Sequence, residues 1–455
     1  MSQTVTTTPR PAPARHAVPE AEKLLPFQAD GVDWILTRRH CCLADDMGLG
    51  KTIQAIAACN HLAVKRVLIV CPHSLKLDWR DAWNRWTTLD LVVQCVSSTT
   101  RTISGDVLIL NYDVIHKWSA AMRQVRWDMA IFDECQFLKN RATRRTRHCL
   151  GWGRPSSVSH IPPIEARRVL FLSGTPMEGG RVSEIWPMLH RIDPDQWGQF
   201  KPFLRWFTYE RSFKVRSASG RMVQVHRSTG VRHAAQLRET LAPVLLRRTK
   251  AQVLPQLPPK IERCVAFPPA GMADVIKREC ELAELAQAQG PASPHFSELA
   301  AIRRRLGEAK IPLVIEQIEG LMEDGQPTLV FAHHISVVEA IAARFEAPVI
   351  RGQVDVATRQ TIVADFQDGT HNLLVIQIRA GGVGLNLQRA QHVGFAEMDW
   401  SPGRMRQAMD RAHRIGQSSR VMVWYWCYDQ SFDARMATSL VEKQRVIDAV
   451  VEPTT

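Results

Sequence analysis

The sequence of 455 residues lacks any run of 18 apolar residues, and it therefore contains no candidate membrane-spanning helix. None of its ten cysteines belongs to a C-x-x-C pair, which argues against a structural zinc site. Unpaired cysteines are typical of a reducing compartment, so we expect a soluble protein of the cytoplasm. The first residues are rich in Thr, Pro and Ala without the apolar core of a signal peptide, and we expect residues 1–20 to form a flexible arm.

Acidic side chains are almost missing from residues 201–260, which hold 13 Lys and Arg but only Glu210 and Glu239 as acids. The net charge of this segment, +11, nearly equals the +13 of the whole chain. Such a concentration of charge favours a local polyanion-binding insertion, and a nucleic acid is the expected partner. A solvated basic surface is the alternative.

Two series of short aliphatic segments run along the chain and predict two α/β units. Each segment is followed by a helix-length amphipathic stretch, which is the pattern of a parallel sheet covered on both faces. We place the first unit at residues 21–195, the second at 311–455, and a helical, cationic region at 196–310 between them. The expected strands begin near residues 40, 66, 106, 129 and 168 in the first unit, and near 328, 347, 372, 392 and 421 in the second.

Aromatic and aliphatic residues recur at helical spacing early in the middle region. Their separations predict the buried face of a helix rather than a base-stacking platform. They are Trp197, Phe200, Phe203, Leu204 and Phe207. Further along, the proline-rich segment 254–260 is expected to begin the crossing to the second unit.

A glycine-containing turn, D-D-M-G-L-G-K-T at residues 45–52, lies between an expected strand and an expected helix. It approaches the phosphate-binding pattern G-x-x-x-x-G-K-[ST], with Asp45 in place of the first glycine. Glycine N–H groups can turn toward a phosphate without a Cβ in the way, and the helix N-terminus adds a favourable dipole. Lys51 would then lie against the β- and γ-phosphates of ATP, and Thr52 would bind Mg²⁺.

A Mg·ATP site also needs carboxylates on a neighbouring strand. The segment M-A-I-F-D-E-C-Q at residues 129–136 supplies them at the end of an apolar run. Asp133 would hold the Mg²⁺ shell, and Glu134 would orient and deprotonate the attacking water. An Asp-Glu pair after a strand is common by itself, but together with the upstream turn it indicates a nucleotide hydrolase.

Eight motifs follow one another between residues 24 and 417. They are LLPFQADGVDWIL, DDMGLGKT, LIVCPHSLKLDW, DECQFLKN, LSGTP, LVFAHH, AGGVGLNLQRA and QAMDRAHRIGQ. This series closely resembles the SWI/SNF-type DNA translocases of helicase superfamily two, and it is most similar in character to their compact annealing-helicase branch. The resemblance implies two RecA-like P-loop lobes in tandem and a DNA-stimulated ATPase that translocates on double-stranded DNA.

The resemblance also implies roles for residues at matching positions. Gln28 would read the adenine edge, Ser173 and Thr175 would couple the γ-phosphate to lobe movement, and Asp45 would belong to an acidic pair that the family shares. The implied nucleotide-binding residues are Gln28, Asp45, Asp46, Met47, Gly48, Leu49, Gly50, Lys51, Thr52 and Gly384. The implied catalytic residues are Lys51, Asp133, Glu134, Gln136, Arg411 and Arg414.

Arginines of the second lobe are expected to reach the nucleotide from across a cleft. Arg411 and Arg414 stand three residues apart, on one helical face, where both can stabilise the charge on the transferring phosphoryl group. Closure on ATP and opening after hydrolysis would change the spacing of two DNA grips. The implied DNA contacts are Ser74, Lys76, Asn111, Tyr112, Arg247, Arg248, His333, His334, Arg351, Gly352, Gly381 and Gly382.

Two positions depart from the pattern of the family. Gln136 stands where histidine is common, and this difference is expected to affect the strength of coupling but not hydrolysis itself. Gln377 stands where Ser or Thr is common, and this difference is expected to alter one phosphate contact. We expect a monomeric motor that uses ATP and Mg²⁺ to remodel protein–DNA or branched DNA structures, in a nucleoid or a nucleus. The alternatives are a strand-separating DNA or RNA helicase and an inactive DNA-binding module.

Overall fold

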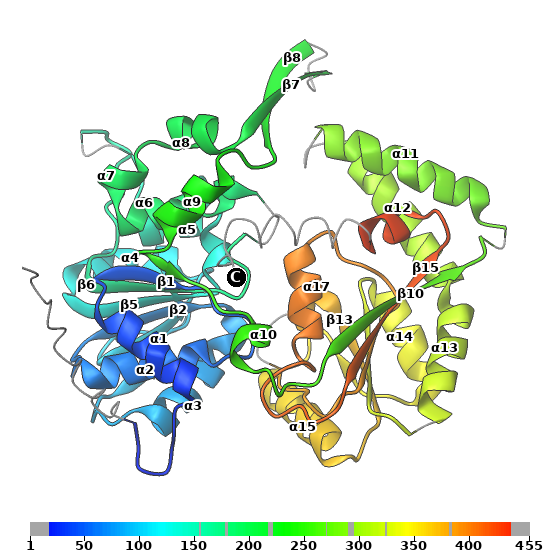
Figure 1. Ribbon diagram of the computed structural model, residues 1–455, viewed down its shortest axis with the longest axis horizontal. Helices are drawn as coiled ribbons and strands as arrows, with labels where there is room; N and C mark the ends of the chain where they lie inside the picture. The colour runs from blue at the N-terminus through cyan, green and yellow to red at the C-terminus, as the bar shows by residue number, and fades with distance from the viewer. Residues whose placement is uncertain are drawn as a thin grey trace, which may run out of the picture.

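Two lobes, each built on a parallel sheet, lie side by side in the protein (Figure 1). No helix in the described part of the chain combines the length and apolar character needed to cross a bilayer. The computed structural model describes residues 18–153, 156–177, 181–216, 222–269, 271–289, 295–323, 325–381 and 385–437.

The first lobe contains a seven-stranded parallel sheet in the order β3-β4-β2-β5-β6-β1-β9. Its strands are β1 (His40–Leu43), β2 (Val67–Cys71), β3 (Val93–Cys95), β4 (Val107–Asn111), β5 (Trp127–Asp133), β6 (Ala166–Leu172) and β9 (Leu245–Leu246). Its helical elements are α1 (Pro26–Leu36), α2 (Lys51–His61), η1 (His73–Leu75), α3 (Lys76–Trp86), α4 (Ile115–Gln124), η2 (Cys135–Leu138) and α5 (Arg144–Leu150).

Both faces of this sheet are apolar, because its strands are nearly continuous apolar segments and each strand sends alternate side chains to opposite sides. In β2, Val67 and Ile69 pack into one core cluster, which also holds Trp79 and Trp83 of α3. Residues Leu68 and Val70 of the same strand join the other cluster, which includes the residues of α4. Two hydrophobic layers therefore hold the sheet between helices, as the continuous apolar segments predict.

The register of the strands brings the predicted catalytic segments to one edge of the first sheet. Leu172 of β6 lies opposite both Leu43 of β1 and Asp133 of β5. All three strands run in the same direction, so the turn 45–52, the acidic pair after β5 and Ser173 leave the sheet side by side.

An insertion of about 70 residues separates β6 from β9 and rises above the first lobe (Figure 1). It contains a pair of strands, β7 and β8, which form an antiparallel hairpin. Its elements are η3 (Val182–Glu184), α6 (Trp186–Ile192), α7 (Pro194–Trp197), α8 (Phe200–Phe207), β7 (Tyr209–Arg216), β8 (Met222–Thr229) and α9 (Ala234–Leu241).

The predicted aromatic helix face is present, although it is shared between two short helices. Trp197, Phe203 and Phe207 are buried, whereas Phe200 and Leu204 are half-buried and pack against the same core. The helix is interrupted at Gly198, whose φ of +50° lies in the left-handed region that favours glycine.

The second lobe contains a six-stranded parallel sheet in the order β10-β15-β14-β11-β13-β12. Its strands are β10 (Lys260–Phe267), β11 (Thr328–Ala332), β12 (Val349–Ile350), β13 (Leu373–Gln377), β14 (His392–Phe395) and β15 (Val421–Tyr428). Its helices are α11 (Ala273–Gln289), α12 (His295–Ala309), α13 (Ile311–Glu323), α14 (Ile335–Phe345), α15 (Val356–Asp368), α16 (Ile378–Gly381) and α17 (Pro402–Met409), and α10 (Lys250–Val253) joins the lobes.

The predicted fold class is confirmed, and every expected strand is present. The middle region differs from a helical insertion in two respects. It contains the β7–β8 hairpin, and it contributes a strand to each lobe, because β9 extends the first sheet and β10 pairs with β15 in the second. The crossing between the lobes therefore runs from residue 247 to residue 259, through the predicted proline-rich segment.

Candidate active site between the lobes

The turn between β1 and α2 is shaped by two glycines in the left-handed region. Gly48 has φ of +82° and Gly50 has φ of +77°, and Gly50 is the N-cap of α2. A Cβ at Gly50 would lie 2.4 Å from Nε2 of Gln28, so close packing also requires glycine here. The ammonium group of Lys51 donates to the backbone carbonyls of Asp45 (2.7 Å) and Asp46 (3.2 Å). The turn thus holds its own lysine at the N-terminus of a helix.

The acidic pair before this turn is bound by the arginine pair that follows β9. The guanidinium of Arg247 donates to Asp46 Oδ1 (2.9 Å) and to the carbonyl of Ala44 (2.8 Å). The guanidinium of Arg248 forms a bidentate pair with Asp45, whose side chain has no exposure. Asp45 therefore replaces the usual glycine because it anchors the turn to the segment that leaves the lobe.

This geometry corrects two predictions. We expected Arg247 and Arg248 to grip DNA, but both guanidiniums are enclosed by the turn, and the side chain of Arg247 is only 1% exposed. We expected Asp45 and Asp46 to contact nucleotide, but their carboxylates hold these arginines, and Asp46 also accepts from the N–H of Lys250 (3.1 Å). Buried charges need such pairing, because an unpaired one would be strongly destabilising.

Other residues of the turn pack their side chains against neighbouring parts of the first lobe and the crossing segment. Leu49 is fully buried and packs with Phe27 and Leu254, while Met47 lies beneath Gly174. Their side chains therefore support the turn, and Met47 also lines the cavity between the lobes. The amide of Gln28 donates to the carbonyl of Leu49 (3.2 Å) and accepts from the N–H of Leu25 (2.9 Å), so it packs against the turn, and its contact with adenine stays a prediction.

Asp133 and Glu134 stand at the carboxyl end of β5. The Asp133 carboxylate accepts from Nε1 of Trp79 (2.7 Å) and from the N–H of Glu134 (2.9 Å). The hydroxyl of Tyr112 donates to the carbonyl of Asp133 (2.7 Å). Glu134 has φ of +49°, an uncommon conformation for a non-glycine residue, and it is the N-cap of η2.

A chain of hydrogen bonds joins Glu134 to the end of β6. Gln136 Nε2 donates to Glu134 Oε2 (2.7 Å), and Gln136 Oε1 accepts from the hydroxyl of Ser173 (2.8 Å). The hydroxyl of Ser173 in turn accepts from the N–H of Thr175 (3.0 Å). An amide at position 136 can donate to one group and accept from another, so glutamine is suited to link these two motifs.

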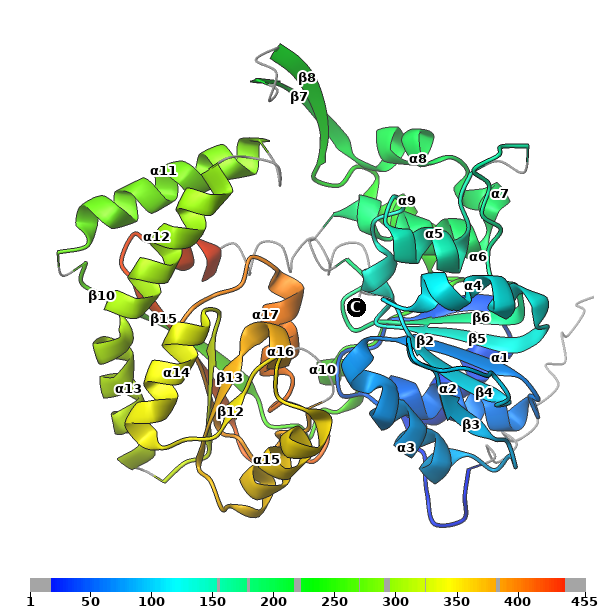
Figure 2. The same cartoon turned by 180° about the vertical axis from the view of Figure 1, so that it is seen from behind.

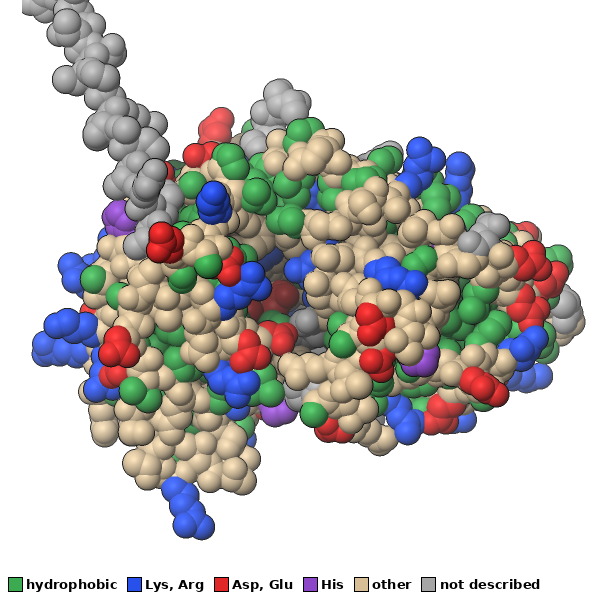
Figure 3. Space-filling view, turned by 90° about the horizontal axis from the view of Figure 1, so that it is seen from below, with side chains coloured by type: hydrophobic (Ala, Val, Ile, Leu, Met, Phe, Trp, Pro, Cys, Tyr) green, Lys and Arg blue, Asp and Glu red, His purple; other side chains and the backbone are tan. Residues whose placement is uncertain are grey.

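The second lobe presents its two predicted arginines to this edge, but from the turn that follows α17 and not from one helical face as predicted, because α17 ends at Met409. A Cβ at Gly48 would lie 2.8 Å from Cβ of Arg414, so the two lobes touch at the glycine of the turn. Gln407 Nε2 of α17 approaches Glu134 Oε2 at 3.5 Å. Figure 3 shows the molecule hollowed between its two halves, with acidic side chains inside the hollow.

The cleft between the lobes is a cavity of about 480 Å³. This volume lies within the range of small-molecule sites in proteins. The cavity is lined by Met47, Gly48, Gly50, Lys51, Thr52, Ile53, Leu75, Asp78, Trp79, Asp81, Ala82, Arg85, Trp86, Asp133, Glu134, Asn386, Arg411 and Arg414.

The charges in the cleft perturb one another. Burial, followed by repulsion from Glu134, raises the pKa of Asp133 to about 7. Burial, followed by repulsion from Arg411, lowers the pKa of Arg414 to about 10. Burial also raises the pKa of Asp78 to about 6, and the nearby charge of Arg411 opposes this rise. Two guanidiniums thus face a carboxylate wall in a poorly solvated space, where an anion and a cation bound together would relieve both repulsions.

The residues present fit a magnesium-bound nucleotide. Thr52 and Asp133 line the same cavity, and a hydroxyl with a carboxylate is an oxygen donor set that Mg²⁺ accepts. The Nε of Arg414 is buried and meets no acceptor among the described residues, so a donor is available to a ligand. Gly384, predicted to bind nucleotide, lies outside the described residues.

Several predicted DNA contacts of the first lobe are committed to other partners. Lys76 is buried, and its ammonium donates to the carbonyl of Val96 (2.6 Å). Tyr112 and Asn111 are also buried, at 2% and 3% exposure. Tyr112 supports Asp133, and burial keeps all three side chains from a DNA backbone in this conformation. Ser74, in η1, is partly exposed and stays a predicted contact.

In the second lobe, the predicted contacts lie at the carboxyl ends of β11 and β12. Glu397 accepts from the N–H groups of His333 (2.9 Å) and His334 (2.8 Å) and from Nδ1 of His334 (2.6 Å). Arg351 pairs with Glu339, and Gly352 is exposed. Gly381 ends α16, and Gly382 lies outside the described residues.

Three residues of the site escaped the sequence reasoning. Trp79 fixes the Asp133 carboxylate, and only the recurrence of tryptophan along α3 could have indicated it. Lys250 donates to Asp410 Oδ1 (2.7 Å) across the lobes, a pairing that the sequence separation conceals. Asn386, inside the quoted segment G-L-N-L-Q, lines the cavity.

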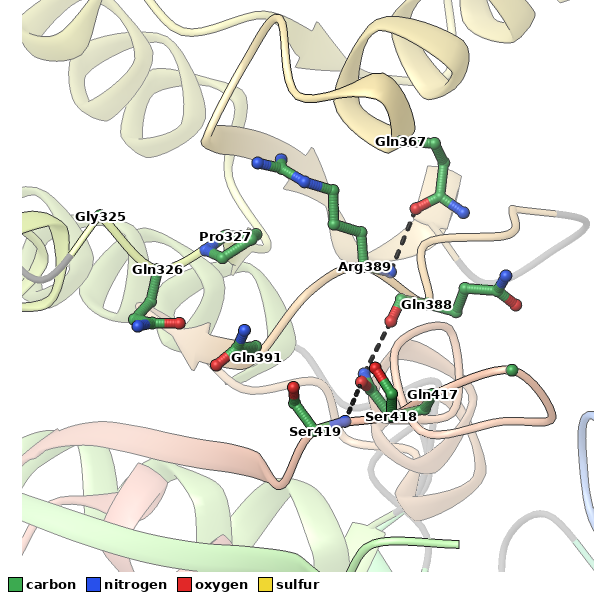
Figure 4. A pocket seen from close by; sticks show the side chains of 11 residues that line it. Gly325, Gln326, Pro327, Gln367, Gln388, Arg389, Gln391, Gln417, Ser418 and Ser419 are labelled. Atoms are coloured by element: carbon green, nitrogen blue, oxygen red, sulfur yellow. Dashed lines mark hydrogen bonds between the residues drawn. The ribbon is translucent and has the colours of Figure 1, made fainter.

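A second polar cavity, of about 500 Å³, lies in the second lobe beside the amino ends of β11 and β14 (Figure 4). Gln417 of the arginine-bearing motif enters its wall, and its Nε2 donates to the carbonyl of Gln388 (2.7 Å). The left-handed φ of Gly416, +94°, lets the chain turn there. Gly416 and Gln417, the last two residues of the motif, therefore line this second cavity and are not among the residues that line the cleft between the lobes.

Comparisons with known protein families match both lobes. A family model described as SNF2-related domain matches residues 27–274, and one described as helicase conserved C-terminal domain matches residues 309–416. The first match alone covers more than half of the chain.

Curated relatives carry related descriptions. The chain is 31% identical to the DNA annealing helicase and endonuclease ZRANB3 of Mus musculus, over 93% of this chain and 40% of that protein. It is 32% identical to the SWI/SNF-related matrix-associated actin-dependent regulator of chromatin subfamily A-like protein 1 of Xenopus laevis, over 93% of this chain and 44% of that protein. The chain thus spans about two fifths of the length of these relatives.

A solved structure described as the Sulfolobus solfataricus SWI2/SNF2 ATPase core in complex with dsDNA aligns with 98% of this chain and 99% of its own. The TM-score is 0.44 and the sequence identity is 20%.

Proposed function

The chain belongs to the SNF2-related family, and on this premise we propose that it is an ATP hydrolase, stimulated by DNA, that translocates on double-stranded DNA. Its substrates would be protein–DNA complexes or branched DNA, which it would remodel without full strand separation. The observation that carries the proposal is the contact of Arg414 with Gly48, because it joins the phosphate-binding turn of one lobe to an arginine of the other.

The residues of the first lobe would bind and orient the nucleotide. The glycine N–H groups and Lys51 would hold the phosphates, while Thr52 and Asp133 would hold Mg²⁺. Bound Mg·ATP supplies the transferable phosphoryl group. Glu134 would hold the attacking water and accept its proton, with its own position fixed by Gln136.

The residues of the second lobe would complete the site only when the cleft is closed. Arg411 and Arg414 would donate to oxygens where negative charge develops, and the low solvation of the cleft would strengthen these contacts. The chain Glu134–Gln136–Ser173 supports a route by which the state of the nucleotide reaches the end of β6, where the insertion begins. Opening and closing of the lobes would then move two DNA-binding surfaces relative to each other.

Steady-state ATP hydrolysis distinguishes this proposal from its alternatives. Turnover should be measured without nucleic acid, with single-stranded DNA, with blunt double-stranded DNA and with RNA, using a Lys51→Ala variant as the background control. We expect stimulation chiefly by double-stranded DNA. A preference for single strands or RNA would favour a strand-separating helicase, and the absence of turnover with every substrate would favour a binding module.

The dependence of DNA binding on salt tests the backbone-contact part of the proposal. Contacts to phosphates release counterions, so the affinity for duplex should fall steeply as salt rises, with a log–log slope of about −0.9 for each phosphate neutralised. A complex whose affinity does not change with salt would contradict binding through the phosphate backbone.

A further inference from the structure

Two exposed aromatic side chains lie together at the base of the β7–β8 hairpin. Among the Trp, Tyr and Phe side chains whose burial the structure describes, only Trp206 and Tyr209 are exposed, at 52% and 57%. They belong to α8 and to the start of β7. Other aromatic side chains of this region, such as Phe203 and Phe207, face the core. Apolar rings left in solvent at one place indicate a contact surface.

The rings are held in place by the surrounding structure. The indole of Trp206 donates to Gln236 Oε1 (3.0 Å) and stacks on His233, with ring centroids 4.8 Å apart. The loop before α9 is tied to α8, because the N–H of Arg232 donates to the carbonyl of Phe207 (2.8 Å). Fixed rings lose little entropy when a planar ligand stacks on them.

Cationic side chains surround the two rings. The guanidinium of Arg232 lies 5.7 Å from the ring of Tyr209, and its Nη1 donates to the carbonyl of Arg205 (3.4 Å). Arg205 and Arg232 are both exposed, as is Lys201 on the same short helix. A platform of rings flanked by positive charge has the chemistry that binds single-stranded nucleic acid, since bases stack on the rings and phosphates meet the cations.

The position of this platform relates it to both lobes. The hairpin and the α11–α12 pair project from the same end of the molecule, one from each lobe (Figures 1 and 2). A duplex held across the two lobes at this end would therefore pass beside the hairpin base. A strand that leaves the duplex at a junction would find the two rings there.

We propose that Trp206 and Tyr209, with Arg205 and Arg232, bind the single-stranded arm of a branched DNA. The inference rests on the proposed function, and it goes beyond that function by assigning the side chains that would hold an unpaired arm. Plain duplex would use the backbone contacts of the lobes, and the rings would add affinity only when unpaired bases are present.

Binding of labelled DNA to the full chain tests the inference by fluorescence anisotropy. The ligands are a blunt duplex and the same duplex with an unpaired arm of about 12 nucleotides, within the site size of single-strand grooves. The arm should increase the affinity of the unmodified protein, and the double variant Trp206→Ala/Tyr209→Ala should lose that increase, about tenfold or more, because the loss of even one base stack has an effect of that size. Trp206→Phe/Tyr209→Phe keeps both rings and should retain it.

Val92→Ala is the matched control, because Val92 is 64% exposed on the first lobe and lies away from the hairpin. Equal losses on the blunt and the armed duplex would overturn the inference. Undiminished binding of the arm would also overturn it, and would leave the rings to a protein partner. If no DNA stimulates ATP hydrolysis while the arm still binds through the rings, the proposed function fails and the arm site stands.

Discussion

The two walls of the cleft differ in how fully their polar groups are already bonded. On the first-lobe wall, Lys51, Asp133 and Glu134 each have hydrogen-bond partners within their own lobe. On the second-lobe wall, the buried Nε of Arg414 meets no acceptor in the described part of the chain. The first wall is therefore organised before a ligand arrives. In the second wall Arg411 Nη1 already donates to the carbonyl of Leu385 (3.5 Å), whereas the Nε of Arg414 is left to donate to what enters the cleft.

This difference assigns separate tasks to the walls. A wall whose groups are fixed by its own lobe can bind a nucleotide when the lobes are apart. A wall with unsatisfied donors stabilises a ligand only when it approaches, so its contribution is made in the closed state. Binding should then depend chiefly on the first lobe, and catalysis on both.

Removing Arg414 should have the largest effect on turnover of the changes considered. Arg414→Ala should lower DNA-stimulated turnover by about 10³-fold or more, as expected for an arginine that contacts the transferring phosphoryl group. ATP affinity should stay within about tenfold, because the first wall supplies most of the binding. Turnover and equilibrium binding of a fluorescent ATP analogue give the two values. A variant that loses binding and turnover equally would show that both walls bind nucleotide.

Glu134→Gln addresses the proposed general base of the first wall. Glutamine keeps the size of the side chain but cannot accept the proton of water, so turnover should fall by about 10²- to 10⁴-fold. ATP and DNA should still bind, measured by the same analogue and by anisotropy. Retained hydrolysis would mean that another group is the base.

Lys250→Met tests the buried ion pair of Lys250 with Asp410, which joins the two lobes. It removes the partner of Asp410, whose carboxylate would stay buried without its cation, and the free energy of unfolding should drop by about 3–5 kcal/mol. The double variant Lys250→Met/Asp410→Leu removes both charges and should regain most of that loss. Denaturant unfolding of the three proteins measures it, and a double variant no better than the single one would contradict a pairwise tie.

The smallest expected effect concerns acid stability of the first lobe. Burial, followed by the charges of Arg191, Arg39 and Arg168, lowers the pKa of His40 from 6.5 to about 4, and its Nδ1 accepts from the N–H of Val169 (3.1 Å). The unfolded chain takes up this proton near pH 6.5 and the folded chain only near pH 4. Stability from this group is therefore present above pH 6.5 and is lost as the pH falls toward 4.

The loss should be on the order of 1 kcal/mol, because the ring is partly exposed and screened. His40→Asn keeps an acceptor but does not titrate, so its unfolding free energy should change less between neutral and acidic pH. Identical pH profiles for the two proteins would show that His40 does not contribute.

Sequence reasoning correctly predicted the elements that depend on residues close together in the chain. The apolar segments became the strands, and the turn 45–52 and the pair Asp133–Glu134 came to one edge because parallel strands end together. The prediction for Arg411 and Arg414 rested on a resemblance and on helical spacing. Arg414 meets Gly48 and both arginines line the cavity, but α17 ends at Met409, so they do not lie on the predicted helical face. Sequence reasoning did not find the hairpin β7–β8, because its apolar alternation is short: Phe213 and Val215 in one strand, and Val223 and Val225 in the other.

The sequence by itself determined the two parallel-sheet lobes and the chemical groups at their edges, since periodicity and turn residues act over a few positions. Only the tertiary structure decided which charges those groups meet. Arg247 and Arg248 are as basic as any DNA-binding residue in the sequence, yet they lie some 200 positions from the acids that bury them. A charge stays at the surface or becomes an internal anchor according to its partner, and partners distant in the chain are brought together only by folding.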